Sequence, residues 1–213
     1  MRGRSTIPAM PTPPPLILGS TSRYRRELLE RLRLPFTCVA PQVDETPLPG
    51  EAPATLALRL ALAKAQAVAT LHPQAVVIGS DQVCDLHGEA LGKPGIHERA
   101  VAQLQRLRGQ QVVFQTAVAV VCHARGYAQA LLAPVTVQFR ALSDAEIERY
   151  LRLDEPYDCA GSAKSETLGI TLLSAIHSDD PTALIGLPLI RTSELLRGAG
   201  IDPLAVPTAS TAP

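Results

Sequence analysis

The stretch from Leu16 to Leu29 constrains the fold more than any other part of the chain, because a short apolar run meets a helical pattern there. The run Leu-Ile-Leu predicts a short buried strand, and Gly19 allows the chain to turn. The hydroxyl residues at 20–22 then provide a helix N-cap. Leucines recur on one face of the segment that follows. This stretch therefore predicts a strand, a tight loop and a helix.

Three arginines, Arg23, Arg25 and Arg26, fall in the first turns of this predicted helix. Cations at a helix N-terminus oppose the helix macrodipole, so the arrangement is locally unfavourable. A phosphate bound at the free N–H groups would reverse that balance. Two interpretations stay open: a phosphate site, or a capped helix with solvated arginines.

The composition limits the class of protein. The chain has 213 residues, 46% of them hydrophobic, which is typical of one globular domain or one domain with two lobes. Its 20 basic and 20 acidic residues cancel, so we expect no nucleic-acid polymer as partner and only a local phosphate site. The four cysteines are far apart in sequence, which favours buried, reduced thiols in a cytoplasmic protein over a zinc site.

The chain ends differ from the rest. Residues 1–15 are rich in proline and lack the apolar stretch of a secretory signal. We expect 1–15 and 205–213 to be disordered tails around a single domain at 16–204. No apolar run approaches the length of a membrane span, which predicts a protein without a membrane segment.

The middle of the chain contains three candidate charged residues. A helix predicted from Pro53 to about Leu71 is apolar on most faces but contains Lys64, whose helical neighbours offer no charge partner. Lys64 either reaches solvent or points into a ligand cleft, and Lys64→Leu is expected to stabilise the free protein. Asp44 and Glu45 are solvated loop residues or ligands of a hard cation.

The apolar run Ala75–Gly79 predicts an inner strand covered on both faces. Asp81 would then sit just beyond the carboxyl end of that strand, where α/β proteins place their ligands. The alternative is that Asp81 caps a turn. Lys93 follows in a loop between Gly92 and Pro94.

Simpler patterns fill the second half of the chain. They predict a hairpin at 83–91, helices at 98–108, 144–153 and 189–197, and antiparallel strands at 112–122 and 127–139. Residues 158–170 are small, polar and punctuated by glycine, as in a binding loop. The P-loop, dinucleotide-binding, serine hydrolase and zinc-protease motifs are absent from the sequence. What remains are cations that suit phosphate (Arg25, Arg26, Lys64, Lys93) and carboxylates that suit a metal, the combination that phosphoryl chemistry needs.

Five ordered motifs make this pattern specific: Gly-Ser-Thr-Ser-Arg-Tyr-Arg-Arg-Glu-Leu-Leu at 19–29, Val-Asp-Glu at 43–45, Lys64, Gly-Ser-Asp-Gln at 79–82 and Gly-Lys-Pro at 92–94. Together with Gly-Leu-Pro-Leu at 186–189 they resemble the Maf family of nucleoside triphosphate pyrophosphatases, from about Leu16 to Leu204.

The resemblance implies an α/β fold of the inosine triphosphatase-like type, with an elongated mixed sheet flanked by helices and two lobes around a cleft. It implies hydrolysis between the α and β phosphates, a divalent cation (Mg²⁺ or Mn²⁺), a cytoplasmic location and often a homodimer. By position, Asp81 would be the proton acceptor and Glu45 and Asp81 the metal ligands. The phosphate contacts would be Ser20, Arg25, Lys64 and Lys93.

Within the family, residues 159–170 resemble the branch that acts on 7-methyl-GTP, in which Tyr24, Gln82 and Glu166 would read the base. The branch often has Trp at the position of Tyr24, but tyrosine keeps an aromatic face for a cationic purine. Glu166 could accept hydrogen bonds from the guanine edge. The alternative is that Tyr24 packs in the core and Glu166 is solvated.

Other functions remain open at this stage. The chain could be the dTTP/UTP pyrophosphatase of the same family, or a nucleotide-binding regulator of septum formation without turnover. A nucleotidyltransferase would need a second substrate that no motif identifies.

Overall fold

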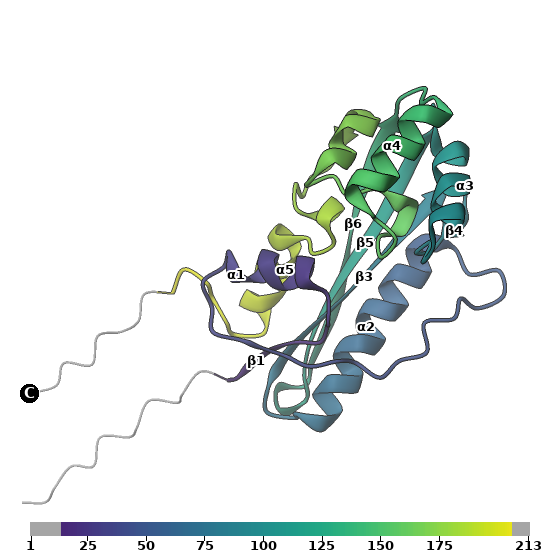
Figure 1. Ribbon diagram of the computed structural model, residues 1–213. Coiled ribbons are helices and arrows are strands. Elements are labelled where there is room, and N and C mark those ends of the chain that lie inside the picture. The colour runs from purple at the N-terminus through teal and green to yellow at the C-terminus, as the bar shows by residue number, and fades with distance from the viewer. Residues whose placement is uncertain (1–13, 206–213) are drawn as a thin grey trace, which may run out of the picture.

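A seven-stranded mixed sheet runs the length of the protein in the computed structural model, which describes residues 14–205 (Figure 1). The strands are β1 (Leu16–Leu18), β2 (Thr37–Cys38), β3 (Val76–Leu86), β4 (Glu89–Leu91), β5 (Gln111–Cys122), β6 (Tyr127–Phe139) and β7 (Leu173–His177). Their order is β2-β1-β3-β5-β6-β7, and β4 pairs with β3. β1 runs parallel to β2 and β3, and the other pairs are antiparallel. The tails expected at 1–15 and 205–213 lie almost entirely outside the described residues.

Five helices flank the sheet: α1 (Arg23–Glu30), α2 (Pro53–Leu71), α3 (His97–Leu107), α4 (Asp144–Asp154) and α5 (Leu189–Gly198). α2 lies along one face of the sheet, α1 and α5 lie on the other side, and α3 and α4 lie together at the far end (Figure 1). Ser143 and Glu146 form the predicted capping box at the start of α4. The predicted α/β fold is confirmed.

Alternation along the strands assigns the two faces. Val77 on β3 and Ala117 and Ala119 on β5 pack with α2. Their neighbours Ile78 on β3 and Val118 on β5 pack with α1 and α5. Because successive side chains of a strand point to opposite faces, Asp81 faces α2 and Ser80 faces the other side. This alternation determines which functional side chains can meet.

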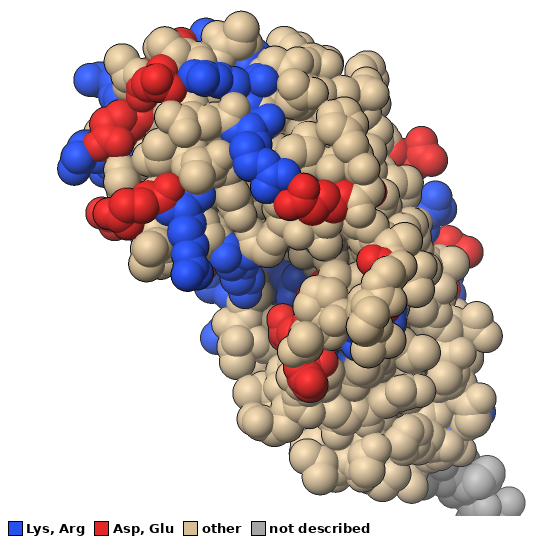
Figure 2. Space-filling view, turned by 90° about the vertical axis from the view of Figure 1, so that its right-hand side faces the viewer, with Lys and Arg blue, Asp and Glu red and all other residues tan. Residues whose placement is uncertain are grey.

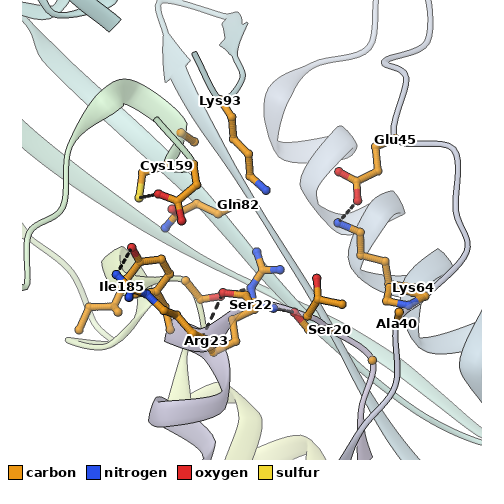
Figure 3. Close-up of a pocket in the computed structure, with 18 residues that line it drawn as sticks. Ser20, Ser22, Arg23, Ala40, Glu45, Lys64, Gln82, Lys93, Cys159 and Ile185 are labelled. Atoms are coloured by element: carbon orange, nitrogen blue, oxygen red, sulfur yellow. Dashed lines mark hydrogen bonds and ion pairs between the residues drawn. The ribbon is translucent and has the colours of Figure 1, made fainter. Parts of the chain in front are cut away.

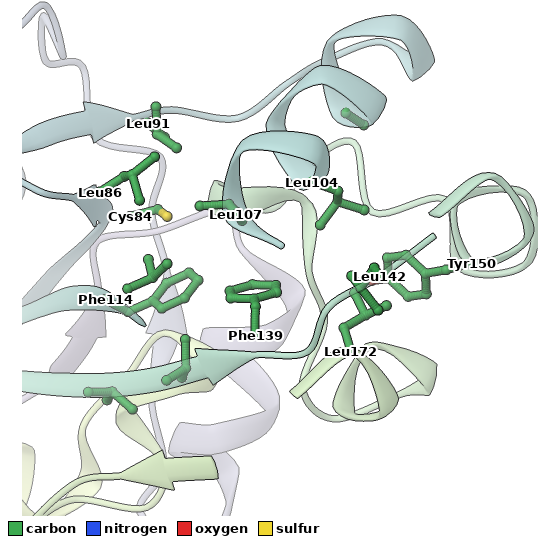
Figure 4. Packing of buried hydrophobic residues seen from close by; sticks show 14 of the residues in the cluster. Cys84, Leu86, Leu91, Leu104, Leu107, Phe114, Phe139, Leu142, Tyr150 and Leu172 are labelled. Atoms are coloured by element: carbon green, nitrogen blue, oxygen red, sulfur yellow. The ribbon is translucent and has the colours of Figure 1, made fainter. Parts of the chain in front are cut away.

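The hydrophobic core is divided in the way that two lobes require. One part lies around β1, α2, α1 and α5. The other lies at the far end of the sheet, where Phe114, Phe139 and Leu142 pack with Leu104 and Leu107 of α3 and with Tyr150 of α4 (Figure 4). β3, β5 and β6 run through both lobes and join them.

Gly79 is required because α2 lies directly against β3. A Cβ atom at this position would come within 2.6 Å of the backbone nitrogen of Ala65 and would also meet the carbonyl of Ala61. The helix could not approach the strand this closely with any other residue. Since Lys64 is next to Ala65, the same close approach brings Lys64 to the strand.

Two expectations are corrected by the fold. β3 does not end at Gly79 but continues to Leu86, because Val77–Asp85 pair with β5. Asp81 is therefore inside β3, just past the point where parallel β1 ends opposite Ile78. The second expectation was that no apolar run approaches the length of a membrane span. This was wrong for α2, which is long and apolar enough to cross a membrane by length and composition. Here it packs on the sheet with Lys64 among its buried residues.

Candidate functional site

Two adjoining cavities of about 470 and 260 Å³ lie between the lobes. They share one charged wall, formed by Arg25, Glu45, Lys64, Gln82, Lys93 and Ala160. The space-filling view shows Lys and Arg side chains gathered around a hollow in one face of the molecule (Figure 2). Figure 3 shows the larger cavity, with Ser20, Lys64 and Glu45 on one side and Arg23, Cys159 and Ile185 on the other. We call these sides the lysine end and the tyrosine end, after Lys64 and Tyr24.

Lys64 joins two carboxylates at the lysine end. Its Nζ lies 2.7 Å from Glu45 Oε1 and 2.7 Å from Asp81 Oδ1. Lys64 and Asp81 are only 5% and 7% exposed, whereas the side chain of Glu45 is 57% exposed. Burial raises the pKa of Glu45, but the hydrogen bond and charge of Lys64, with the charges of Lys93 and Arg25, outweigh it and leave the pKa below its ordinary value.

Lys64 does not reach solvent, and its charge partners come from other elements than its own helix. Its helical neighbours indeed carry no charge, but Glu45 comes from the loop before α2 and Asp81 from β3. Sequence periodicity reports only neighbours within one helix, so it could not reveal partners on other elements.

Arg25 lies on α1, between the two ends of the cleft. Its Nε donates to the carbonyl oxygen of Gly186 at 2.9 Å. Burial lowers the pKa of Arg25, and the nearby charges of Asp81 and Glu45 oppose that effect. Among residues 14–205, no carboxylate lies within ion-pair distance of this guanidinium. Arg25 is thus a half-buried cation held by a carbonyl group at the wall of a cavity.

The loop that holds Arg25 is itself fixed by Asp180. Asp180 is 1% exposed and accepts hydrogen bonds from the backbone N–H groups of Ile190 and Arg191 at the start of α5. Its other oxygen accepts from the backbone N–H of Thr182, whose hydroxyl donates to the carbonyl of Leu187. These bonds fix residues 180–187, so the carbonyl of Gly186 is placed for Arg25.

Ser20, Ser22 and Lys93 complete the polar wall of the larger cavity. Ser22 is the N-cap of α1 and accepts from the backbone N–H of Arg25. Ser20 Oγ accepts from the backbone N–H of Ser22 at 3.1 Å. Lys93 extends into the cavity from the loop after β4, and no carboxylate of the described residues forms an ion pair with it (Figure 3). The N-cap Ser22 and the cations Arg25 and Lys93 therefore border one cavity.

The tyrosine end holds two of the three residues predicted to read a base. Gln82 Nε2 donates to Thr116 Oγ1 at 2.9 Å and to the carbonyls of Ala183 and Leu184, both at 3.0 Å. Tyr24 is half-buried at the cavity wall, and burial is the largest cause of its raised pKa. It does not pack in the core, which removes the alternative interpretation of this residue.

Glu166 and Arg26 do not line either cavity. Glu166 is exposed, on a loop that Lys164 fastens to the end of α4 by donating to the carbonyls of Asp154 and Glu155. The predicted role of Glu166 stays a prediction. Arg26 is exposed and pairs with Glu30 at 3.2 Å. It therefore does not lie with the other predicted phosphate-binding cations at the cleft.

The sequence did not define the role of several residues of the site, although Arg23 was already named among the arginines of the first helix. Arg23 and Asp158 line the larger cavity, and Gly186 contributes a carbonyl group rather than a side chain. Asp158 begins the segment predicted as a binding loop, which was the only signal available for it. A carbonyl acceptor leaves no trace in residue type, so Gly186 could not be identified by chemistry alone.

Together these features define an α/β protein whose cleft is lined by several cations beside two carboxylates. A sequence model of the family described as "Maf-like protein" matches residues 15–199. The chain belongs to the Maf family.

The chain is similar to named proteins of several organisms. The chain is 69% identical over 191 residues to a protein of Polaromonas sp., covering 90% of this chain and 87% of that protein. It is 66% identical over 189 residues to a protein of Albidiferax ferrireducens, covering 89% and 95% of the two chains. A protein of Bordetella pertussis is 60% identical over 199 residues, with 93% and 98% covered. All three relatives are named 7-methyl-GTP pyrophosphatase.

Proposed function

We propose that this protein is a nucleotide pyrophosphatase that cleaves 7-methyl-GTP between the α and β phosphates, giving 7-methyl-GMP and pyrophosphate. The observation that carries the proposal is the charged wall of the cleft, where Arg25 and Lys93 form no ion pair with a carboxylate of residues 14–205, beside the Glu45–Lys64–Asp81 cluster. Cations in a recess without anionic partners suit a triphosphate, and the nearby carboxylate supplies a base. The names of the relatives support the same substrate.

In the proposed mechanism Asp81 is the general base. Lys64 donates to Oδ1 of Asp81, which fixes the carboxylate and leaves Oδ2 to accept a proton from water. The water oxygen attacks the α-phosphorus, the bond from that phosphorus to the bridging oxygen breaks, and pyrophosphate leaves with the electron pair. Arg25 and Lys93 would stabilise the charge that develops on the phosphate oxygens.

A divalent cation fits the donors of this site. Glu45 and Asp81 offer hard carboxylate oxygens close enough to share one ammonium group. The described residues contain no group of three or more His, Cys, Asp or Glu side chains placed to hold a metal. Mg²⁺ is commonly held by one or two carboxylates plus substrate phosphates, so Glu45 and Asp81 would be its protein ligands. When bound, the ion would neutralise phosphate charge. Mg²⁺ or Mn²⁺ is therefore our proposal for the cofactor.

The choice of 7-methyl-GTP over other nucleotides would be made at the tyrosine end. N7-methylation gives guanine a delocalised positive charge, which an aromatic face attracts by roughly 0.5–2 kcal/mol depending on desolvation. Tyr24 lines the cavity and is half-buried, as such a contact needs. Glu166 would act at the guanine edge if its loop moves towards the cleft.

The test is pyrophosphate release from 7-methyl-GTP, GTP, UTP and dTTP with Mg²⁺ or Mn²⁺, using wild type and Asp81→Asn. We expect the highest kcat/KM for 7-methyl-GTP. Asp81→Asn should lower kcat about 10²–10⁴-fold, because an amide cannot accept the proton, and should still fold, because Lys64 keeps Glu45 as a partner.

Three outcomes would contradict the proposal. Preference for UTP or dTTP would indicate the pyrimidine branch. Nucleotide binding without turnover would favour a regulatory protein. Near-normal turnover by folded Asp81→Asn would remove Asp81 from the mechanism.

A further inference from the structure

The tyrosine end of the cleft already holds a planar cation that belongs to the chain itself. The guanidinium carbon of Arg23 lies 4.7 Å from the centroid of the Tyr24 ring. Nη2 of Arg23 also donates to Tyr24 Oη at 3.0 Å. Both residues line the larger cavity, and Figure 3 labels Arg23 at its wall. One cation–π contact of the candidate base site is thus occupied in the free protein.

The surroundings of Arg23 favour a positive charge at this place. The hydrogen bond with Tyr24 is the main cause of its raised pKa, and Asp158 and Glu27 add to it through their charges. Asp158 lines the same cavity and accepts a hydrogen bond from the thiol of Cys159 at 3.4 Å. Arg23 is exposed and forms no ion pair within 4.0 Å among the described residues, so it can leave the ring without breaking one.

A guanidinium group and a 7-methylguanine ring share the properties that favour binding to the face of the Tyr24 ring. Both are planar, both carry a delocalised positive charge, and both present several N–H donors in that plane. Two such cations cannot occupy one ring face at once, and side by side they repel each other. The contact made by Arg23 therefore indicates what kind of ligand the Tyr24 face can hold.

We propose that Arg23 is a specificity-determining residue that occupies the Tyr24 ring face in the free protein and must leave it when a 7-methylguanine base binds. The proposal rests on the proposed function, because it takes 7-methyl-GTP as the substrate. Every purine that binds to this face must displace Arg23, and this displacement lowers the affinity of binding. Only the cationic purine also meets the repulsion of the displaced guanidinium, so Arg23 reduces the preference for the methylated base.

The experiment measures binding of 7-methyl-GMP and GMP by calorimetry to wild type, Arg23→Gln and Arg26→Gln. Neither nucleotide contains an α–β phosphate bond, so neither can be consumed by the proposed reaction. Arg26→Gln is the matched control, because Arg26 is on the same helix but outside both cavities. Arg23→Gln should tighten 7-methyl-GMP binding roughly twofold to thirtyfold, the range of cation–π energies. It should tighten GMP binding less, and Arg26→Gln should match wild type.

An unchanged or lower ratio of 7-methyl-GMP to GMP affinity in Arg23→Gln would overturn the proposal, as would the absence of 7-methyl-GMP binding to both proteins. A failure of the proposed function looks different. In that case wild type releases no pyrophosphate from 7-methyl-GTP, while the binding ratio still reports whether Arg23 competes for the ring.

Discussion

At the scale of single residues, Lys64 is a buried cation whose charge partners come from other elements of the fold. On its own helix Lys64 is an isolated cation, but in the folded protein it is the only group that directly pairs both Glu45 and Asp81 among the described salt bridges. Such a lysine has a structural role as well as a chemical one. Removing it leaves Asp81 buried without its cation.

Lys64→Leu should therefore destabilise the free protein, which reverses the expectation from sequence. Breaking one partner of a buried ion pair costs about 3–5 kcal/mol, and this corresponds to a fall in Tm on the order of 10 °C for a chain of this size. The measurement is thermal unfolding without nucleotide or metal. Lys93→Leu is the control, because Lys93 is exposed and forms no ion pair with the described residues.

A second variant separates charge from packing. Lys64→Leu combined with Asp81→Asn removes the unpaired carboxylate, so it should recover part of the lost stability. A Tm for Lys64→Leu equal to or above that of wild type would show that the ion pair contributes nothing to folding.

At the scale of elements, the segment that joins β2 to α2 determines where Glu45 lies. Its end is fastened to α2 by Arg59, whose Nε and Nη2 donate to the two oxygens of Glu51 at 2.6 and 2.7 Å. Arg59 also donates to the carbonyl of Thr46 at 3.1 Å, and Glu51 accepts from the backbone N–H of Leu48. A two-pronged contact of this kind is stronger than a single ion pair.

The Glu51–Arg59 contact predicts a specific dependence of stability on pH. The hydrogen bonds from Arg59, followed by the one from Leu48, lower the pKa of Glu51 from 4.5 to about 2. Because the folded pKa is the lower one, the stabilisation is complete above pH 4.5 and is lost as the pH falls towards 2. Wild type should thus melt above Glu51→Gln at pH 7, and the gap should narrow below pH 4.5.

The measurement is Tm for both proteins from pH 7 down to pH 3. Glu30→Gln is the control, since Glu30 forms an exposed pair within α1 that should contribute little. A gap that stays constant as the pH falls would show that the charge of Glu51 is not what holds the segment.

At the scale of the whole molecule, features that nearby residues determine could be predicted from the sequence. Features that depend on contacts between distant segments could not. The bounds of β6 and the start of α2 were predicted to the residue and the end of α2 approximately, because proline, glycine and periodicity mark them locally. The length of β3 was not, because its second half is a strand only through pairing with β5. Gly79 was interpreted as the end of a strand, but glycine is needed at this position because α2 lies so close to β3.

The site follows the same rule. The sequence motifs identified six candidate site residues that the structure brings to the two cavities. They are Ser20, Arg25, Lys64, Asp81, Gln82 and Lys93. What could not be predicted were contacts between elements: the bridge from Lys64 to Glu45 and Asp81, and the carbonyl of Gly186 on Arg25. The contact between Arg23 and Tyr24 was also missed, because neighbours in sequence on a helix rarely face each other.

The proposed reaction cleaves 7-methyl-GTP between the α and β phosphates, and the identity of its products tests this. Wild type with Mg²⁺ and 7-methyl-GTP should be followed by anion-exchange chromatography and phosphorus NMR. We expect equal amounts of 7-methyl-GMP and pyrophosphate. Formation of 7-methyl-GDP and inorganic phosphate would mean cleavage between the β and γ phosphates, and the proposed reaction would then be wrong.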